Sequence, residues 1–276
     1  MDDTTGPLAD REWRLVREES RPGAMQMALD EIAAETAADG GPRTVRVYQW
    51  SPSCLSLGYG QDPDTVDWAV CEREGIDVVR RQTGGGGIYH DEVGDVSYAI
   101  VAPKAELPGD LMDAYHLLLT PVLAAFERLG VDADYADEEW PSVYDPACYL
   151  RALHPAHDLV VDGRKVAGNA QYRRRDAVIQ HGSLTYAVKA ARHLSTFADP
   201  AVSPEQFRER VTGIDDHADV SREEVVTTVE DALAAWTGAE EGEWTDAELD
   251  RARERAKEKY ESEEWTRRRP TERSDA

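Results

Sequence analysis

Four consecutive glycines, Gly84 to Gly87, follow the strand-like stretch VVRRQT and precede IYHD. Glycine loses more conformational entropy on folding than any other residue and adds no side chain to a core. A run of four therefore indicates either a flexible hairpin loop or a close approach of backbone to a ligand. The run is not a Walker A loop and does not open a helix as GxGxxG does. Arg80 and Arg81 border it, and arginines beside glycine-rich backbone can bind phosphate or carboxylate.

The length and composition indicate a globular enzyme-sized chain. Its 276 residues allow one large domain, or one with a small appendage, and 41% hydrophobic residues suffice for a sizeable core. No stretch approaches the roughly 18 uninterrupted apolar residues of a membrane span. The acidic start MDDTTGPLADREW lacks the apolar segment of a signal peptide. We therefore expect a cytoplasmic location and no membrane partner.

The charge balance excludes one large class of partners. Asp and Glu number 55 against 31 Lys and Arg, a formal net charge of −24. A field of that sign opposes the binding of nucleic acid. Few of the basic residues are lysines, and an acid-rich, lysine-poor surface is favoured in cytoplasm at very high salt, where screening weakens self-repulsion. The composition therefore predicts a halophilic source, with an ordinary acidic bacterial protein as the alternative.

Hydrophobic periodicity predicts an α+β fold. Strands are expected at 44–50, 54–60, 75–83, 95–103 and 177–188, and helices at 22–35, 111–129, 221–238 and 245–265. Asp162-Gly163 joins 159–161 and 164–166 as a hairpin, and Thr245 with Glu248 fits a capping box. Residues 132–155 read as loop. We divide the chain into a loose arm (1–12), a catalytic domain (13–202) and a helical C-terminal accessory region (203–276).

Lys165 is the lysine that most suggests chemistry. In the predicted hairpin it lies opposite Val160, on the other face of the sheet from Leu159 and Val166. Its neighbour Arg164 shows that the chain uses arginine where any cation suffices. A lysine here suggests a need for a compact ammonium rather than a planar guanidinium. The alternative is a solvated strand lysine.

Three cysteines form no CxxC pair and no metal-ligand spacing, so neither a metal site nor a disulfide scaffold is expected. Two of the three are expected to be buried. Cys148 lies in irregular chain upstream of Lys165, a place for an accessible thiol. Asn169 and Gln171 could donate hydrogen bonds to a ligand, or be outward-facing strand residues. His90 taken alone is more typical of a structural histidine.

Several of these motifs together resemble the lipoate–protein ligase A family. RRQTGGGGIYHD is similar to its RRxTGGG…H segment, and DLVVDGRKVAGNAQYRRRDAVIQHGSL resembles its second signature. WRLVREESRPGAMQMALDEIAAE and YQWSPSCLSLGYGQ look like its N-terminal helix and second strand. The resemblance covers Trp13 to Leu194 and continues faintly near the C-terminus. It implies a mixed, mainly antiparallel sheet carrying helices, shared with biotin ligases.

The resemblance also implies an activity and partners. Members attach lipoate or octanoate to one lysine of lipoyl domains in 2-oxoacid dehydrogenase complexes or of the glycine-cleavage H protein. In the ligases, ATP with Mg²⁺ activates the acyl carboxylate as an adenylate. Lys165 would hydrogen-bond the acyl carbonyl and stabilise developing charge. The other residues matched to the family's substrate site are Arg80, Arg81, Thr83, Gly84, Gly85, Gly86, His90, Asp158, Gly168, Asn169, Ala170, Gln171, His181 and Gly182.

Two features leave the activity open between branches. PACY around Cys148 and QHGSL resemble the cysteine octanoyltransferases, which pass octanoyl from acyl carrier protein through a thioester without ATP. TGGGG and Asp158 look more like the ligases, although Asn169 stands where ligases usually have serine. We prefer the ATP-dependent ligase, with the Cys148 octanoyltransferase as the alternative. A non-catalytic homologue that binds lipoyl domains is a lesser one.

Overall fold

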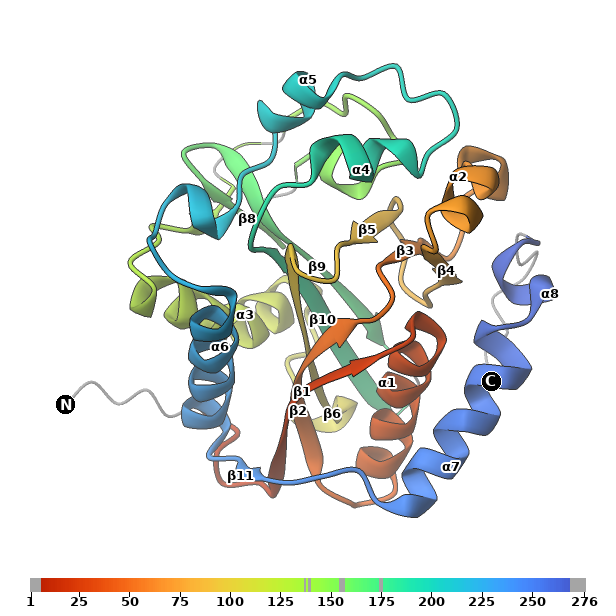
Figure 1. The fold of residues 1–276 in the computed structure, drawn as a ribbon. Coiled ribbons are helices and arrows are strands. Elements are labelled where there is room, and N and C mark those ends of the chain that lie inside the picture. Colours follow the sequence, from red (N-terminus) through yellow and green to blue (C-terminus); the bar gives the residue numbers. More distant parts are fainter. Residues whose placement is uncertain (1–5, 137, 139, 154–156, 174–175, 269–276) are drawn as a thin grey trace.

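The structure is a computed structural model that describes residues 6–136, 138, 140–153, 157–173 and 176–268. A mixed sheet of eight strands forms its centre, in the order β11-β1-β2-β6-β10-β9-β8-β7 (Figure 1). β1 pairs in parallel with β2 and β11, and every other neighbouring pair in this sheet is antiparallel. The predicted α+β class with a mainly antiparallel sheet is confirmed. The strands are β1 (Trp13–Arg21), β2 (Arg43–Trp50), β6 (Asp95–Pro103), β7 (Asp134–Tyr135), β8 (Asp158–Val161), β9 (Arg164–Arg173), β10 (Ala177–Thr185) and β11 (Glu240–Glu241).

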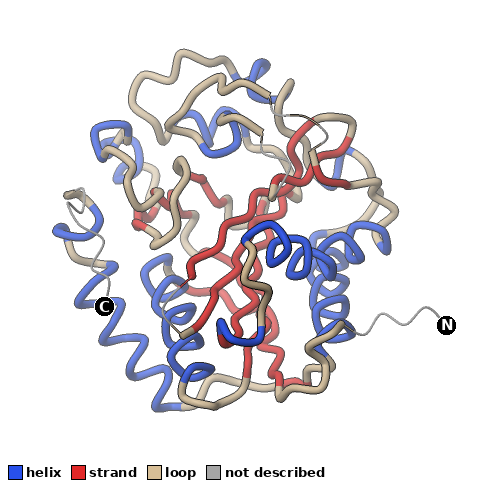
Figure 2. Tube along the Cα trace, turned by 180° about the vertical axis from the view of Figure 1, so that it is seen from behind, coloured by secondary structure: helices blue, strands red, loops and turns tan. Residues whose placement is uncertain are grey.

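Helices cover both faces of this sheet (Figures 1 and 2). Helix α1 (Gly23–Ala38) packs on one face, with α7 (Asp246–Arg255) outside it. Helices α3 (Leu111–Arg128) and α6 (Arg222–Thr237) pack together on the other face. Because both faces are covered, β6 reads as an almost continuous apolar run, and eight of its nine residues are buried.

A second, smaller sheet lies beside the first. Its order is β4-β3-β5, with β3 (Cys54–Leu57) parallel to β4 (Asp77–Arg80) and antiparallel to β5 (Ile88–His90). Leu55 and Leu57 of β3 share an apolar cluster with residues of α2 (Trp68–Arg73), α4 (Ala190–Ser195) and α5 (Pro204–Arg208). The glycine run lies in the connection from β4 to β5, the two outer strands of this smaller sheet.

The structure differs from the sequence-based elements at both ends. Residues 13–21, which resembled the start of the family's N-terminal helix, form strand β1, and the helix begins at Gly23. The helix expected over 245–265 is interrupted: α7 continues as a π-helix over Ala256–Tyr260, and a separate α8 covers Glu263–Thr266. The capping box of Thr245 and Glu248 is confirmed.

The segments outside the expected catalytic domain pack on the same cores. The Gly6 amide donates to the Trp236 carbonyl (2.7 Å), and Leu8 is buried against the cluster that holds α6. Strand β11 extends the main sheet. In the described part of the chain, both sides of residue 202 therefore contribute to one sheet and its cores. No helix there is long and apolar enough to cross a membrane.

Candidate active site

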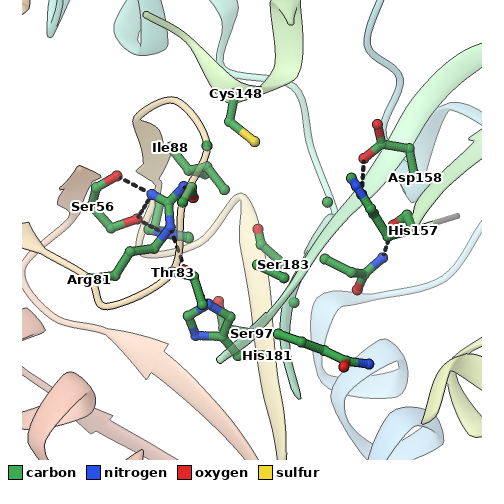
Figure 3. Close-up of a pocket in the computed structure, with 18 of the residues that line it drawn as sticks. Ser56, Arg81, Thr83, Ile88, Ser97, Cys148, His157, Asp158, His181 and Ser183 are labelled. Atoms are coloured by element: carbon green, nitrogen blue, oxygen red, sulfur yellow. Dashed lines mark hydrogen bonds and ion pairs between the residues drawn. The ribbon is translucent and has the colours of Figure 1, made fainter. Parts of the chain in front are cut away.

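A cavity of about 440 Å³ lies where the ends of the two sheets meet. Of the residues singled out in the sequence, it is lined by Arg81, Thr83, Gly84, Gly85, His90, Cys148, Asp158, Lys165, Gly168, Asn169, Ala170, Gln171, His181 and Gly182. Arg80 and Gly86 do not line it. Figure 3 shows the sulfur of Cys148 directed into the space between Arg81 and Ile88 on one side and Asp158 on the other.

Lys165 is buried in the wall of the cavity. Val160 is its partner in the β8–β9 ladder, as the hairpin pattern predicted, and Leu159 and Val166 face the main core. Its Nζ lies 2.6 Å from Oδ1 of Asp158. Burial opposes the charge of both groups, but each charge stabilises the other. The pKa of Lys165 is therefore raised and that of Asp158 is lowered, so Lys165 presents an ammonium to the cavity at neutral pH.

The Cys148 loop is held by the glycine run. The Gly87 amide donates to the Pro146 carbonyl (2.7 Å), and the Cys148 amide donates to the Gly87 carbonyl (2.9 Å). A Cβ on Gly86 would lie 2.7 Å from the Pro146 oxygen and 2.8 Å from the Cys148 nitrogen. Gly86 is therefore required where two backbone segments cross, and the ligand-facing role expected for it is not what the geometry shows. Cys148 itself is half-buried, whereas Cys54 and Cys71 are buried as expected.

Arg81 shapes the cavity by holding its glycine loop. Nε donates to Thr83 (3.0 Å), Nη1 to the Ser56 carbonyl (2.7 Å), and Nη2 to the carbonyls of Gly84 (2.8 Å) and Gly86 (2.7 Å). Nη1 is also 3.4 Å from Ser56 Oγ. These contacts use all five N–H groups of the guanidinium. Arg81 therefore contributes positive charge to the cavity while its hydrogen bonds fix the loop.

Arg80 has a structural role instead of the ligand-binding one expected. It is fully buried, and Nη1 donates to the carbonyls of Gly58, Tyr59 and Gln61. Nε donates to the carbonyl of Trp265 (3.0 Å) and Nη2 to that of Thr266 (3.1 Å). Adjacent residues of a strand point to opposite faces, so only one of two neighbouring arginines can face the cavity.

His90 and His181 both belong to the cavity wall. His181 Nε2 lies 3.0 Å from Thr83 Oγ1. His90 is buried, stacks on Trp50 with ring centroids 4.2 Å apart, and has an oxygen partner at each ring nitrogen. Burial lowers its pKa, so the ring is neutral. Polar residues of the wall that the sequence reasoning missed include Ser56, Ser97, Tyr115, Asp145, Arg151, His157 and Ser183.

The amide side chains of β9 divide between structure and cavity. Asn169 Oδ1 accepts from the Tyr98 hydroxyl (2.7 Å) and its Nδ2 donates to the His157 carbonyl (2.8 Å), so Asn169 fixes the wall. A Cβ at position 182 would lie 2.2 Å from Asn169 Oδ1, which explains why the residue there is glycine. Neither polar atom of the Gln171 amide has a partner among the described residues. The Gln171 amide, which lines the cavity, therefore has its hydrogen-bonding capacity unused by the described residues, and its binding of substrate stays a prediction.

The cavity combines paired cations with an apolar lining. Lys165 is paired with Asp158, and the donors of Arg81 are bonded to protein oxygens. Among the described residues no group of three or more His, Cys, Asp or Glu side chains could hold a metal ion. Met27, Tyr48, Trp50 and Ile88 supply an apolar lining suited to a hydrocarbon chain.

Known proteins are similar to this chain in sequence and in fold over most of their length. Octanoyltransferase LipM of Halalkalibacterium halodurans is 32% identical over 92% of this chain and 98% of its own. LipM of Geobacillus kaustophilus is 33% identical over 94% and 99%. A crystal structure of lipoate-protein ligase A bound with ATP has a TM-score of 0.78 at 25% identity, covering 94% of this chain and all (100%) of that one. A bi-partite lipoate protein ligase from Thermoplasma acidophilum shares the fold, with a TM-score of 0.77 at 24% identity, covering 96% and 99%. The model of the lipoyl protein ligase A/B catalytic domain matches residues 22–234, and the chain belongs to that family.

Proposed function

We propose that this protein transfers octanoyl from octanoyl acyl carrier protein to the acceptor lysine of a lipoyl domain, through a thioester on Cys148. The observation that carries the proposal is that the Cys148 thiol and the Lys165 ammonium line one largely apolar cavity. Three relatives that are 30–33% identical, each covered over 97% or more of its own length, are named octanoyltransferases. Both points favour the alternative over the ATP-dependent ligase that we preferred from the sequence.

In the first step the Cys148 sulfur attacks the carbonyl carbon of the octanoyl thioester on the carrier protein. A new C–S bond forms, the bond to the carrier's thiol breaks, and that thiol leaves with the proton that Cys148 gives up. The reaction exchanges one thioester for another, so its free-energy change is small and no ATP is needed. Octanoyl is then held on the enzyme with its chain along the apolar lining.

In the second step the neutral amine of the acceptor lysine attacks the Cys148 thioester. An amide bond forms, the C–S bond breaks, and the proton lost by the amine returns the Cys148 thiol. Conversion of a thioester to an amide is favourable, which drives the transfer. The acceptor would be a lipoyl domain of a 2-oxoacid dehydrogenase complex or the glycine-cleavage H protein.

Lys165 supports both steps as a fixed cation. Its raised pKa keeps the ammonium protonated, so it donates a hydrogen bond and does not act as the base. In both steps negative charge develops on the carbonyl oxygen of the octanoyl group, and a preorganised ammonium in a buried site stabilises it. Asp158 holds the ammonium in place through the 2.6 Å contact.

An ATP-dependent ligase is the competing function, since the ligase A structure with bound ATP has the same fold. It would place an acyl-adenylate in this cavity with ATP and Mg²⁺ as substrate. Arg81 is bonded to protein oxygens and Lys165 to Asp158, but Arg151 also lines the cavity as a cation that could meet a phosphate. The thiol of Cys148 would then have no chemical role.

Intact mass of an apo lipoyl domain separates the two functions. With octanoyl acyl carrier protein and no ATP, we expect a gain of one octanoyl group, and a shorter incubation without acceptor should leave one octanoyl on the enzyme. Cys148→Ala should abolish both, while Cys71→Ala, a buried cysteine away from the cavity, should retain them. A gain that requires ATP and free acid, and survives Cys148→Ala, would establish the ligase instead.

A further inference from the structure

Ser56, His90 and Asp95 form a hydrogen-bonded series in the cavity wall. Ser56 Oγ lies 2.9 Å from His90 Nε2, and His90 Nδ1 lies 2.8 Å from Asp95 Oδ2. The strand register produces the first contact: Cys54 pairs with His90 and Ser56 with Ile88, so Ser56 and His90 are diagonal neighbours across β3 and β5. Asp95 begins β6, the next strand of the chain.

The direction of these hydrogen bonds is set by charge. Nδ1 of His90 faces a carboxylate, which can only accept, so Nδ1 carries the proton. The buried ring is neutral, because burial lowers its pKa, and Nε2 therefore accepts the Ser56 hydroxyl proton. Asp95 is itself fixed by the hydroxyls of Ser97 (2.9 Å) and Ser183. Ser56 is thus a hydroxyl beside a base that is oriented by a third group.

Two members of the series are buried residues in the lining of the cavity in which the proposed function places the acyl group. Ser56 and His90 are among its lining residues, and Figure 3 shows Ser56 next to Arg81 on one wall, with Cys148 entering from another. Arg81 Nη1 is 3.4 Å from Ser56 Oγ, which places positive charge beside the oxygen that would give up its proton and attack. The proposed octanoyl transfer uses none of these three side chains as a reacting group.

We infer that Ser56, His90 and Asp95 form a second catalytic centre, a serine hydrolase site that releases medium-chain acyl groups from esters and thioesters in this cavity. Ser56 Oγ attacks the acyl carbonyl as His90 takes its proton, and the C–S or C–O bond to the leaving group breaks. His90 returns that proton to the leaving thiol or alcohol. Water then attacks the Ser56 ester, with His90 as base, and gives the free acid and the original serine.

The inference rests on the proposed function only in taking the cavity to accept a medium-chain acyl group. It is tested in the Cys148→Ala protein, which lacks the proposed thioester, so the two can fail separately. We expect Cys148→Ala to hydrolyse 4-nitrophenyl octanoate, and the further change Ser56→Ala to lower the rate about 100-fold or more. His90→Gln should cause a loss of similar size.

Covalent labelling provides a measurement that does not depend on the folding of the Ser56 and His90 variants. An octyl fluorophosphonate added to full-length Cys148→Ala should label Ser56, located by peptide mass, and should leave Ser97 and Ser183 of the same cavity unlabelled. Hydrolysis that persists in the double variant, or a folded protein with neither hydrolysis nor label on Ser56, would overturn the inference. In that case the three groups only hold β3, β5 and β6 together.

Discussion

Cys148 is the most accessible of the three cysteines. Burial raises the pKa of Cys71 to about 11 and that of Cys54 well above its usual range, whereas Cys148 is half-buried in the cavity wall. A thiol reacts as thiolate, so the two buried residues are protected by both access and ionisation. We expect iodoacetamide at pH 8 to add one carbamidomethyl group, at Cys148, and octanoyl acyl carrier protein to slow the reaction. Equal labelling of Cys71, by peptide mass, would contradict this.

His193 makes the stability of the fold sensitive to acid. Burial lowers its pKa to about 3, and Nε2 has no partner among the described residues. The unfolded chain binds this proton below about pH 6.5 and the folded chain only near pH 3, so stability is lost as the pH falls between these values. The cost between pH 6.5 and pH 5 is roughly 1.5 kcal/mol.

His193→Phe should remove that cost, because phenylalanine binds no proton. The new ring should fit the site, since the His193 ring packs against Phe197 and Phe207 beside a small cavity. Urea unfolding at pH 6.5 and at pH 5 measures it: the free energy of unfolding should fall less between the two pH values in the variant than in the natural protein. An unchanged difference between the two would show that another group is responsible.

The sequence predicts which single residues can take part in chemistry better than it predicts which other residues they contact. Lys165 stands out in the sequence because it is a lysine beside Arg164, because the hairpin fixes the face on which it lies, and because it matches the family's motif. Arg80 was misassigned because neighbouring arginines look alike until the sheet shows which one is covered by the C-terminal segment. Ser56 carries no signal of its own, since its importance comes from a histidine 34 residues away.

The residues of the glycine run have different structural roles. Gly85 adopts a φ of 94°, and Gly86 lies against the backbone of the Cys148 loop, whereas a Cβ on Gly84 would meet nothing within 4 Å. Gly86→Ala must therefore displace the loop that carries Cys148, and we expect octanoyl transfer to fall about 100-fold or more. The matched change Gly84→Ala should cost much less, although Gly84 lines the cavity.

Transfer rates of both variants, with thermal unfolding to check the fold, measure the difference. Gly109→Ala is a neutral control, because a Cβ there also meets nothing within 4 Å and its φ is ordinary. Equal losses for Gly84→Ala and Gly86→Ala would mean that the run acts through ligand contact, as the resemblance alone implied.

The C-terminal segment that contains α8 is hydrogen-bonded to the residues that precede the glycine run. Trp265 Nε1 donates to the Arg80 carbonyl (2.7 Å), and the Tyr260 hydroxyl accepts from Gln82 (2.8 Å), so both neighbours of Arg81 are held. We expect Trp265→Ala to loosen the loop that Arg81 holds and to reduce transfer about tenfold, with Trp265→Phe in between. Trp140→Ala is the control, since that side chain is 42% exposed. Full activity of Trp265→Ala would show that the contact serves stability alone.

For the whole molecule, the sequence predicts the class of fold from periodicity and the identity of most strands. It does not predict how β1 joins the sheet, because β1 pairs with residues 43–50 in parallel and its outer edge is covered by Glu240 and Glu241. Nor does it predict that α6 packs in the main core. The apolar face of that helix shows that it is buried, but not which strands and helices cover it. Long-range pairing of this kind leaves no local pattern in the chain.

The surplus negative charge is a property of the whole molecule, and it predicts how the melting temperature responds to salt. Carboxylates such as Asp30, Asp158 and Glu248 are buried beside a cation, so the net charge of −24 arises from the other, mostly exposed carboxylates. Raising KCl from 0.1 M to 1 M shortens the screening length from about 10 Å to about 3 Å and weakens their repulsion. Exposed ion pairs are weakened too, but each contributes only about 0–1 kcal/mol. We therefore expect the melting temperature to rise by roughly 5 °C or more. NaCl at the same ionic strength should reproduce the rise, and a melting temperature that falls with KCl would show that attraction between surface charges outweighs their repulsion.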